Sequence, residues 1–291
     1  MPKLVWLNGE ISPLETATTS VADHAHLYGD GLFEGIRIYN KKIFKLDQHL
    51  DRLYHGIAYM GFEMHIPQGE LRKTILEVAK QADLDAGYVR LNVTRGTGLG
   101  LDPKNINRVP NVMIMISSLA LFPPDTYEVG LSAATCSLRV IPADSLDPRV
   151  KAIGRYASNI LAKQEANAKG AGEGLLLNHE GYLAEGTGDN LFLVYGRTIR
   201  TPDPACGVLK GVTRDTVVEL ARRAGFEVDD SAWLTPFDVF SADEAFLTGT
   251  AAEVVPMVSL DGRKIGCGQK GEVTAEIMSL FKTHTDTGVP F

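Results

Sequence analysis

The stretch DPRVKAIGRYASNILAKQEANAKGAGEGLLLNHEGYLAEGTGDN, residues 147–190, carries the residues on which the interpretation of the whole chain depends. Lys151 opens a segment that has helical character over 154–169, and Tyr156 follows five positions later. Two short apolar runs, 173–178 and 181–185, then predict a hairpin that delivers Glu185 into a glycine-rich turn. The stretch thus combines an amine, a phenol and a carboxylate, three groups with acid–base chemistry.

Outside this stretch, the spacing of apolar residues predicts an α/β protein in which strands and helices alternate. A hairpin over 4–14 turns at Asn8-Gly9, and a strand at 32–39 follows it. Asp47 is expected to cap a helix that ends at Gly61. The other predicted elements are helices at 69–83, 213–224 and 271–283, and strands at 88–94, 111–118, 130–136, 190–195, 198–201 and 244–248.

The segment LFPPDTYEVG, residues 121–130, is the best candidate for a linker between domains. Its Pro123-Pro124 pair stiffens the chain and disfavours a helix. A chain of 291 residues is long enough for two domains of ordinary size. The sequence therefore predicts a smaller α/β domain at 1–120 and a larger domain at 131–291.

Composition narrows the class of protein and of partner. The hydrophobic fraction is 44% and the charged fraction 22%, which is typical of globular proteins. A net charge of −7 disfavours nucleic acids and anionic membranes as partners, since both bind basic surfaces. No apolar run reaches the ~18 residues of a membrane span, and the N-terminus lacks the apolar core of a signal peptide.

The three cysteines, Cys136, Cys206 and Cys267, are odd in number and far apart. This spacing argues against a disulfide framework and a zinc site, and it favours a reducing, cytoplasmic compartment. His24 and His26 have no third ligand at any usual spacing, so no metal site is predicted. GTGLG at 96–100 lacks the GxGxxG spacing of a dinucleotide-binding loop.

Two turns could bind a phosphate. Val212 and Thr213 follow a glycine and open a predicted helix, whose unpaired amides and dipole suit an anion. Thr250 and Ala251 follow the strand at 244–248 in a Gly-Thr turn, a possible anion-binding nest. Taken alone, a helix N-cap and an ordinary turn are the simpler explanations. Local chemistry thus leaves an α/β protein that could bind a phosphate.

Seven segments together resemble the fold-type IV pyridoxal-phosphate aminotransferases, most closely the branched-chain amino acid aminotransferases. They occur in the family's order and at its spacing, from about residue 6 to 265: YGDGLFEGIR (28–37), HLDRL (49–53), YVR (88–90), KAIGRY (151–156), YLAEGTGDNLF (182–192), LKGVTRD (209–215) and TGTAAE (248–253). The resemblance implies a small N-terminal α/β domain and a larger C-terminal domain with a mixed sheet or pseudo-barrel. Arg155 departs from the family's pattern, in which a smaller polar residue such as asparagine is expected.

The resemblance also implies a role for each matching residue. Lys151 corresponds to the lysine that holds pyridoxal 5′-phosphate as an internal aldimine, Tyr156 to the phenol beside the cofactor's O3′, and Glu185 to the carboxylate that pairs with the pyridine nitrogen. The phosphate cradle would consist of Arg52, Val212, Thr213 and Thr250. The substrate pocket and its carboxylate site would include Tyr28 from across a dimer interface, Phe33, Arg37, Tyr88, Arg90, Thr250 and Ala251.

The implied reaction is a ping-pong transamination between L-leucine, L-isoleucine or L-valine and 2-oxoglutarate. Implied partners are these small amino acids and 2-oxo acids, with a homodimer or higher homo-oligomer as the assembly. D-Amino acid transaminase, (R)-amine transaminase and aminodeoxychorismate lyase remain alternatives within the same fold. A non-catalytic protein that binds a phosphorylated ligand is a more remote alternative.

Overall fold

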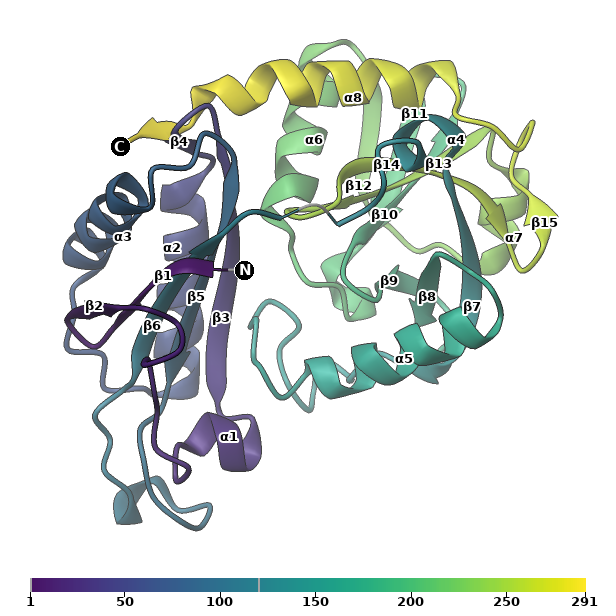
Figure 1. Ribbon diagram of the computed structural model, residues 1–291. Helices are drawn as coiled ribbons and strands as arrows, with labels where there is room; N and C mark the ends of the chain where they lie inside the picture. Colours follow the sequence, from purple (N-terminus) through teal and green to yellow (C-terminus); the bar gives the residue numbers. More distant parts are fainter. Residues whose placement is uncertain (1, 120) are drawn as a thin grey trace. The chain divides into compact units, whose positions relative to one another are not determined.

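The computed structural model describes residues 2–119 and 121–291 (Figure 1). Contacts between Cα atoms divide the chain into two compact units. The first unit contains the residues up to Leu119 together with Val150–Tyr156 and Thr285–Phe291. The second unit contains residues 121–149 and Ala157–His284. This division differs from the predicted one, because two short late segments belong to the first unit. Residue 120, where the predicted first domain ends, lies outside the described residues.

The first unit is built on a seven-stranded antiparallel sheet with the order β16-β4-β3-β5-β6-β1-β2. Its strands are β1 Pro2–Leu7, β2 Glu10–Ser12, β3 Gly31–Tyr39, β4 Lys42–Ile43, β5 Gly87–Thr94, β6 Val112–Ser117 and β16 Val289–Pro290. The helices α2 Leu46–Met60 and α3 Gln68–Ala82 cover one face of this sheet (Figure 1), and a short helix α1 spans His24–Tyr28. The strands and helices predicted in this part of the chain are confirmed, whereas α1 was not predicted.

Buried and partly buried residues alternate along β5, so this strand presents one buried face and one more accessible face. Val89, Leu91 and Val93 are fully buried, while the residues between them are only partly buried. The predicted cap of α2 is wrong: Lys45 is the N-cap residue, and Asp47 lies in the first turn. There the Asp47 carboxylate accepts a hydrogen bond at 2.6 Å from Arg72 of α3, so it ties two helices together.

Six strands of the second unit close into a ring. In order around it they are β10 Asn190–Tyr195, β13 Glu244–Gly249, β14 Glu253–Leu260, β7 Leu131–Arg139, β8 Glu173–Leu177 and β9 Leu183–Gly186, and β9 pairs again with β10. Its interior is filled by aliphatic side chains, among them Leu175, Leu191, Leu193 and Leu247. The strands β11 Thr198–Pro202, β12 Glu227–Ala232 and β15 Arg263–Lys264 extend this barrel-like sheet.

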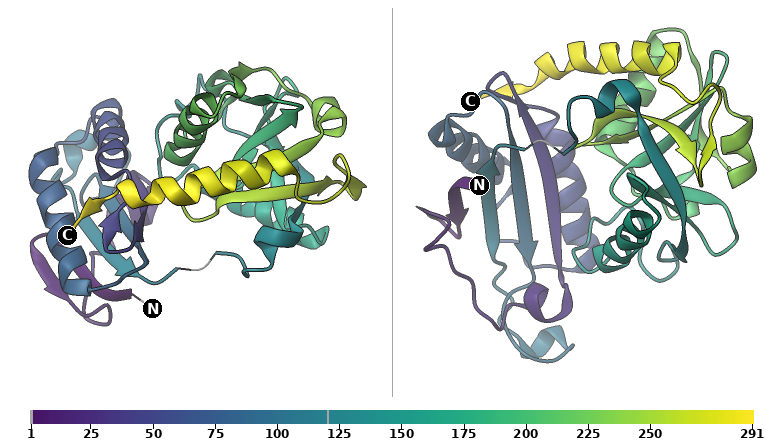
Figure 2. Two further views of the ribbon diagram at one scale, coloured as in Figure 1. Left: turned by 90° about the horizontal axis from the view of Figure 1, so that it is seen from above. Right: turned by 45° about the vertical axis from the view of Figure 1, so that its right-hand side comes forward.

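Helices pack against the barrel: α5 Tyr156–Ala168, α6 Val212–Arg223, α7 Pro236–Ser241 and α8 Glu272–His284. Figure 2 shows α8, in yellow, beside the green α6, which also packs on β12 and β13. The predicted linker contains a short helix, α4 Thr126–Val129, because Pro124 precedes its N-cap and leaves its hydrogen bonds intact. Short 3-10 turns occur at Pro103–Asn105, Pro204–Cys206 and Thr285–Thr287. The elements β12, β14, β15 and α7 were not predicted.

Candidate active site

Lys151 lies on an extended segment that pairs with β3. The Phe33 amide donates to the Lys151 carbonyl at 3.2 Å, and Ile153 N donates to Gly31 O at 2.8 Å. An isolated bridge between Leu32 and Ala152 completes this pairing. The expectation that Lys151 opens a helix is therefore wrong, since α5 begins only at Tyr156. Backbone hydrogen bonds to β3 fix the lysine instead.

The Lys151 amine is surrounded by aromatic groups and a phenol. Its Nζ donates to Tyr156 Oη at 2.7 Å and lies 4.6 Å from the centre of the Phe33 ring. The rings of Phe33 and Tyr156 meet edge to face, with centroids 4.8 Å apart. A lysine held in this way has a fixed amine position and a polar partner through which a proton can move. The structure thus brings two residues of the predicted site into direct contact.

Three further predicted residues, Arg37, Tyr88 and Arg90, share the Phe33 face of the sheet. The β3–β5 register pairs Phe33 with Asn92 and Arg37 with Tyr88. The Arg90 guanidinium lies 3.7 Å from the centre of the Phe33 ring, a cation–π contact. Burial raises the pKa of Tyr88, so its phenol stays protonated at neutral pH. This face combines aromatic surface with two permanent cations, a suitable wall for an apolar carboxylic acid.

Arg52 lies on the other face of the sheet, where it belongs to a buried charged cluster. Its Nε and Nη2 each donate to the Glu34 carboxylate at 2.7 Å, and His49 Nδ1 donates to Glu34 Oε2 at 2.7 Å. Burial opposes the charge of Glu34, but the charge of Arg52 and the hydrogen bonds from Arg52 and His49 prevail and lower the pKa of Glu34 to about 2. Burial lowers the pKa of His49, which keeps this imidazole neutral. Glu34 therefore fixes the orientation of Arg52.

Tyr28 ends α1 and remains 44% exposed. Its hydroxyl accepts a hydrogen bond from the Gly100 amide at 3.0 Å, and His24 Nε2 donates to the Gly100 carbonyl at 2.9 Å. The loop at 96–101, whose glycines lack the GxGxxG spacing of a dinucleotide-binding loop, is thus held against α1 by hydrogen bonds. Leu99 and Leu101 in this loop are 74% and 79% exposed, which leaves apolar surface next to Tyr28.

In the second unit, a β-bulge points Glu185 out of the barrel. The β8–β9 register shifts between Leu176↔Glu185 and Leu177↔Leu183, which leaves Ala184 as the extra residue. Leu183 faces the interior cluster, whereas Ala184 packs outside with Leu176, so Glu185 also faces outward. Glu185 also pairs with Asn190, the pair that closes the ring. Its Oε2 accepts a hydrogen bond from the Leu209 amide at 2.8 Å.

The two predicted phosphate turns meet the segment that follows Glu185. Asn190 Nδ2 donates to the Leu209 carbonyl at 2.9 Å, just before Val212 and Thr213 open α6. A Cβ atom on Gly211 would lie 2.1 Å from Asn190 Oδ1, and one on Gly249 would lie 2.0 Å from Asp189 Oδ1. Asp189 and Asn190, which follow Glu185 in the chain, thus lie against Gly211 before α6 and against Gly249 before the Thr250-Ala251 turn.

Sequence reasoning missed the residues that support this segment. The buried Glu173 accepts hydrogen bonds from the Thr187 amide, at 2.8 Å, and from the Thr187 hydroxyl. Asn159 Nδ2 donates to the Thr187 carbonyl at 2.8 Å. A glutamate that begins the apolar run EGLLL was the available signal for Glu173. Glu34 gave the same kind of signal, a lone carboxylate within the apolar strand LFEGIRI.

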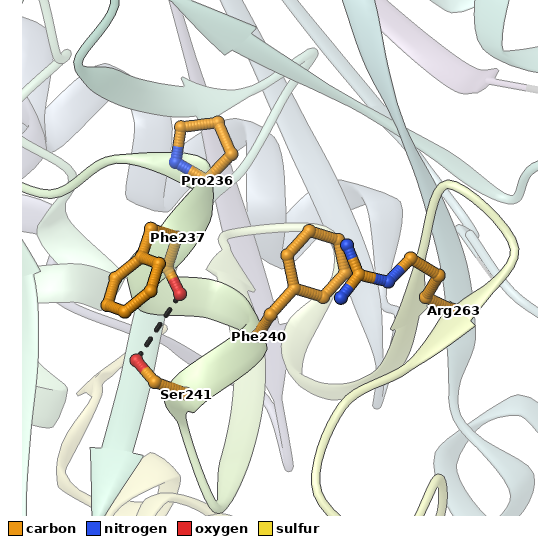
Figure 3. A pocket seen from close by; sticks show the side chains of 5 residues that line it. All are labelled: Pro236, Phe237, Phe240, Ser241 and Arg263. Atoms are coloured by element: carbon orange, nitrogen blue, oxygen red, sulfur yellow. Dashed lines mark hydrogen bonds between the residues drawn. The ribbon is translucent and has the colours of Figure 1, made fainter.

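Other parts of the molecule offer less chemistry. A surface pocket of about 440 Å³ is lined by Pro236, Phe237, Phe240, Ser241 and Arg263 (Figure 3), none of which is a predicted site residue. Within residues 2–119 and 121–291, no cluster of three or more His, Cys, Asp or Glu could hold a metal ion. No helix in the same ranges is long and apolar enough to cross a membrane.

The chemistry of the donors fits a phosphorylated pyridine aldehyde. Lys151 offers an amine, Tyr156 a phenol, and Glu185 a carboxylate held by a backbone amide. The first turn of α6 has a glycine N-cap and no side-chain cap, so its amides are available to an anion. Each functional group of such a cofactor has a matching partner type among the described residues.

Comparison with known proteins agrees with this chemistry. The family profile described as "Amino-transferase class IV" matches residues 31–260. A "Putative branched-chain-amino-acid aminotransferase" of Methanocaldococcus jannaschii is 42% identical over 279 residues, which cover 96% of this chain and 95% of that protein. The branched-chain-amino-acid aminotransferase of Pseudomonas aeruginosa is 35% identical over 96% of this chain and 91% of that protein.

Solved structures give the same result. The branched-chain amino acid aminotransferase of Escherichia coli superposes with a TM-score of 0.93 at 31% identity, covering 98% of this chain and 95% of that one. The enzyme of the same name from Thermobaculum terrenum, solved in its PLP-form, gives 0.87 at 30% identity, covering 98% and 94%. Pyridoxal 5′-phosphate is thus the cofactor of this protein. The sequence match, the superposition and the donor chemistry together show that the chain belongs to the class IV aminotransferases, the group to which these branched-chain-amino-acid aminotransferases belong.

Proposed function

We propose that the protein transfers the amino group of L-leucine, L-isoleucine or L-valine to 2-oxoglutarate in a ping-pong reaction. The observation that carries this proposal is the Lys151 amine, 2.7 Å from the Tyr156 phenol and beside a Phe33 ring whose neighbour is the Arg90 cation. A nucleophilic amine, an apolar ring and a cation that could bind a carboxylate lie close together here, which supports the proposal. The names of the relatives support the same substrate class.

Bound pyridoxal 5′-phosphate would supply a reactive aldehyde and an electron-withdrawing ring. Lys151 would form the covalent link to that aldehyde and, once released as a free amine, would carry the proton removed from the substrate's Cα. Tyr156 Oη, which accepts a hydrogen bond from Lys151, would hold the amine in place. Glu185 would favour the protonated form of the pyridine nitrogen through its opposite charge.

The phosphate would be held by Arg52 and by the amides of the turns at Val212-Thr213 and Thr250. The buried Glu34 restrains Arg52 through two hydrogen bonds, and the side chains of Asp189 and Asn190 lie close against the two turns. A cofactor that changes its covalent partner during each cycle needs such an independent anchor. A phosphate close to a double negative charge is well matched by a guanidinium and by helix N-terminal amides.

The substrate carboxylate would be bound by Arg37 and Arg90 and by the amides of Thr250-Ala251, and the branched side chain would pack on Phe33 and Tyr88. Arginine suits this role because its planar donors match a carboxylate. We further propose a homodimer, in which Tyr28 and the exposed leucines of the loop at 96–101 form part of the contact between subunits. Three separate cysteines, all of them free, support a cytoplasmic location.

The substrate class can be tested by comparing rates with L-leucine, D-alanine and (R)-1-phenylethylamine, with 2-oxoglutarate as amino acceptor. We expect L-leucine to react fastest. Faster turnover of D-alanine or of the amine would assign the protein to one of the alternative reactions of the same fold. Absence of L-leucine turnover would contradict the proposal.

The role of Lys151 can be tested separately by colour. The purified protein should absorb at ~410–430 nm, where a lysine-bound aldehyde cofactor absorbs. Lys151→Ala should lose both this band and all transamination, whereas Lys169→Ala, which changes an exposed ion pair with Glu165, should keep both. A Lys151→Ala protein that retains the band would show that another amine binds the cofactor.

A further inference from the structure

Arg214 is the most deeply buried cation in the part of the chain that the structure describes, with 1% of its surface exposed. It is the third residue of α6, directly after Val212 and Thr213. Its Nη2 donates to the carbonyls of Asp230, at 2.6 Å, and of Pro202, at 3.4 Å. These carbonyls belong to β12 and β11, so the guanidinium ties the first turn of α6 to two strands.

The position of Arg214 is unfavourable for a cation. The N-terminus of a helix carries a partial positive charge, which repels an arginine in the first turn. Removal of the guanidinium from water adds a further cost, and its Nε has no hydrogen-bond partner among the described residues. An apolar side chain of similar size would avoid both costs. An anion bound at the α6 N-terminus would offset them, because its charge is opposite to that of Arg214.

Arg214 also holds the Asp215 carboxylate, the nearest group of the protein that could compete with a ligand for the first-turn amides of α6. Asp215 lies in the first turn of α6, where its carboxylate is attracted to the free amides. Arg214 Nη1 instead holds Asp215 Oδ1 at 2.9 Å, and Lys210 Nζ lies 3.7 Å from Asp215 Oδ2. The N-cap residue Gly211 provides no side-chain oxygen for the amides either. The first-turn amides are therefore kept available for a ligand.

We infer that Arg214 is a positioning residue for the cofactor phosphate: it holds the first turn of α6 against β11 and β12 and keeps the Asp215 carboxylate away from the amides that bind the phosphate. This inference rests on the proposed phosphate site at Val212-Thr213. Arg214 touches neither the phosphate nor the substrate in this role, so its contribution should appear only for ligands that carry a phosphate.

The test compares pyridoxal 5′-phosphate with pyridoxal, which lacks the phosphate, by absorbance titration of the cofactor-free protein. The ratio of the two dissociation constants measures the contribution of the phosphate. Arg214→Met should lower this preference for the phosphorylated form by about tenfold or more, as expected when a charged hydrogen-bonding group is lost. Arg222→Met is the matched control, because Arg222 ties the other end of α6 to β12 through Val228 O and Asp230 Oδ1. It should leave the ratio unchanged.

Arg214→Lys provides a second variant if the methionine protein does not fold. Lysine keeps the charge but cannot contact Asp215 and both carbonyls together, so the ratio should fall in the same direction by a smaller factor. An Arg214 variant that binds both ligands more weakly by the same factor would overturn the inference and leave the phosphate site standing. A wild-type protein without preference for the phosphorylated form would instead overturn the phosphate site itself.

Discussion

At the scale of single residues, a few buried carboxylates hold the groups that carry the chemistry. Glu34 is completely buried and accepts hydrogen bonds from Arg52 and His49. Glu173 does the same for Thr187, two residues after Glu185. A buried charge is stable only when it is paired and fully hydrogen-bonded. Each of these carboxylates therefore enforces one arrangement of its neighbours, and loss of the carboxylate should release that arrangement.

Glu34→Gln tests the first of these clusters. The pKa of Glu34 is lowered from 4.5 to about 2, so the folded state favours the ionised carboxylate. Its stabilising contribution is complete above the unfolded pKa and is lost as the pH falls from there through about 2. We expect wild-type protein to lose about 3 kcal/mol from this group over that range, and Glu34→Gln to lack this loss. Urea unfolding at pH 7, 5, 4 and 3 measures both slopes.

At pH 7, Glu34→Gln should cost about 3–5 kcal/mol in unfolding free energy, because the largely buried Arg52 guanidinium loses the negative charge opposite it. Glu63→Gln is the control, since the Glu63–Arg108 pair is roughly half exposed and should contribute ~0–1 kcal/mol. Equal effects of the two substitutions would show that the buried Glu34 cluster contributes no more to the free energy of unfolding than an exposed ion pair does.

Thr187→Val tests the second cluster with a nearly isosteric change. The variant leaves the Glu173 carboxylate without the Thr187 hydroxyl donor, at a site where both side chains are buried. We expect a loss of about 1–3 kcal/mol in unfolding free energy, together with weaker binding of the cofactor. Thr198→Val, which removes an exposed hydroxyl bonded to Glu227, should stay within about 0.5 kcal/mol of wild type. Comparable losses in both variants would contradict the assigned role of Glu173.

At the scale of elements, the segment 150–154 is the least regular part of the site and the one that positions Lys151. It pairs with β3 by backbone hydrogen bonds, and its Gly154 N also donates to the carbonyl of Gly29, the C-cap of α1, at 3.0 Å. The two glycines approach so closely that a Cβ on Gly29 would lie 2.7 Å from the Gly154 Cα. This approach allows the lysine segment to continue the edge of the sheet without forming a strand of its own.

Gly29→Ala should break this approach. Gly29 has a φ of +70°, so alanine would incur backbone strain as well as the clash with Gly154. Gly61→Ala is a matched control, because Gly61 caps α2 with a φ of +66° and a Cβ added there would meet no atom within 4 Å. We expect about 1 kcal/mol of destabilisation for Gly61→Ala and about 1–3 kcal/mol more for Gly29→Ala, from urea unfolding. Similar values for both would show that the clash is relieved without cost.

The elements also show which features could be predicted from sequence. Periodicity located α2, α3, α6 and α8 and most strands, because each buries one apolar face. It could not locate the bulge at Ala184, since a register shift depends on the partner strand and leaves no trace in a single run of residues. Without that bulge, strict alternation would direct Glu185 into the barrel. The extended state of Lys151 was missed for the same reason, because β3 imposes it.

Polar partners were the other features that the sequence did not reveal. The resemblance identified Arg52, yet nothing near it in sequence indicated that Glu34 and His49 would hold it. Glu173 and Thr187 are 14 residues apart and meet because β8 pairs with β9 in the observed register. Local patterns predict elements well, whereas contacts between distant residues depend on topology. The functional groups were therefore easier to identify than the residues that support them.

At the scale of the whole molecule, the two units supply different chemistry. The first unit provides the amine, the phenol and three arginines, Arg37, Arg52 and Arg90, whereas the second provides the carboxylate and the amide-rich turns. The first unit also exposes apolar side chains around α1 and the loop at 96–101: Val21, Leu27, Tyr28, Leu99 and Leu101. Apolar surface of this kind, clustered by hydrogen bonds to Tyr28 and His24, is typical of a contact between subunits.

Leu99→Asp combined with Leu101→Asp should convert the proposed homodimer into a monomer. Burial of two leucines contributes ~3 kcal/mol or more, so the dissociation constant should rise by at least about 100-fold. Analytical ultracentrifugation over a range of concentrations measures this change. Phe237→Asp is the control, because Phe237 is 78% exposed on α7 of the second unit and should leave the dimer intact. Activity should fall with dissociation if Tyr28 acts across the interface. A doubly substituted protein that stays dimeric would place the contact elsewhere, and a fully active monomer would show that each chain holds a complete site.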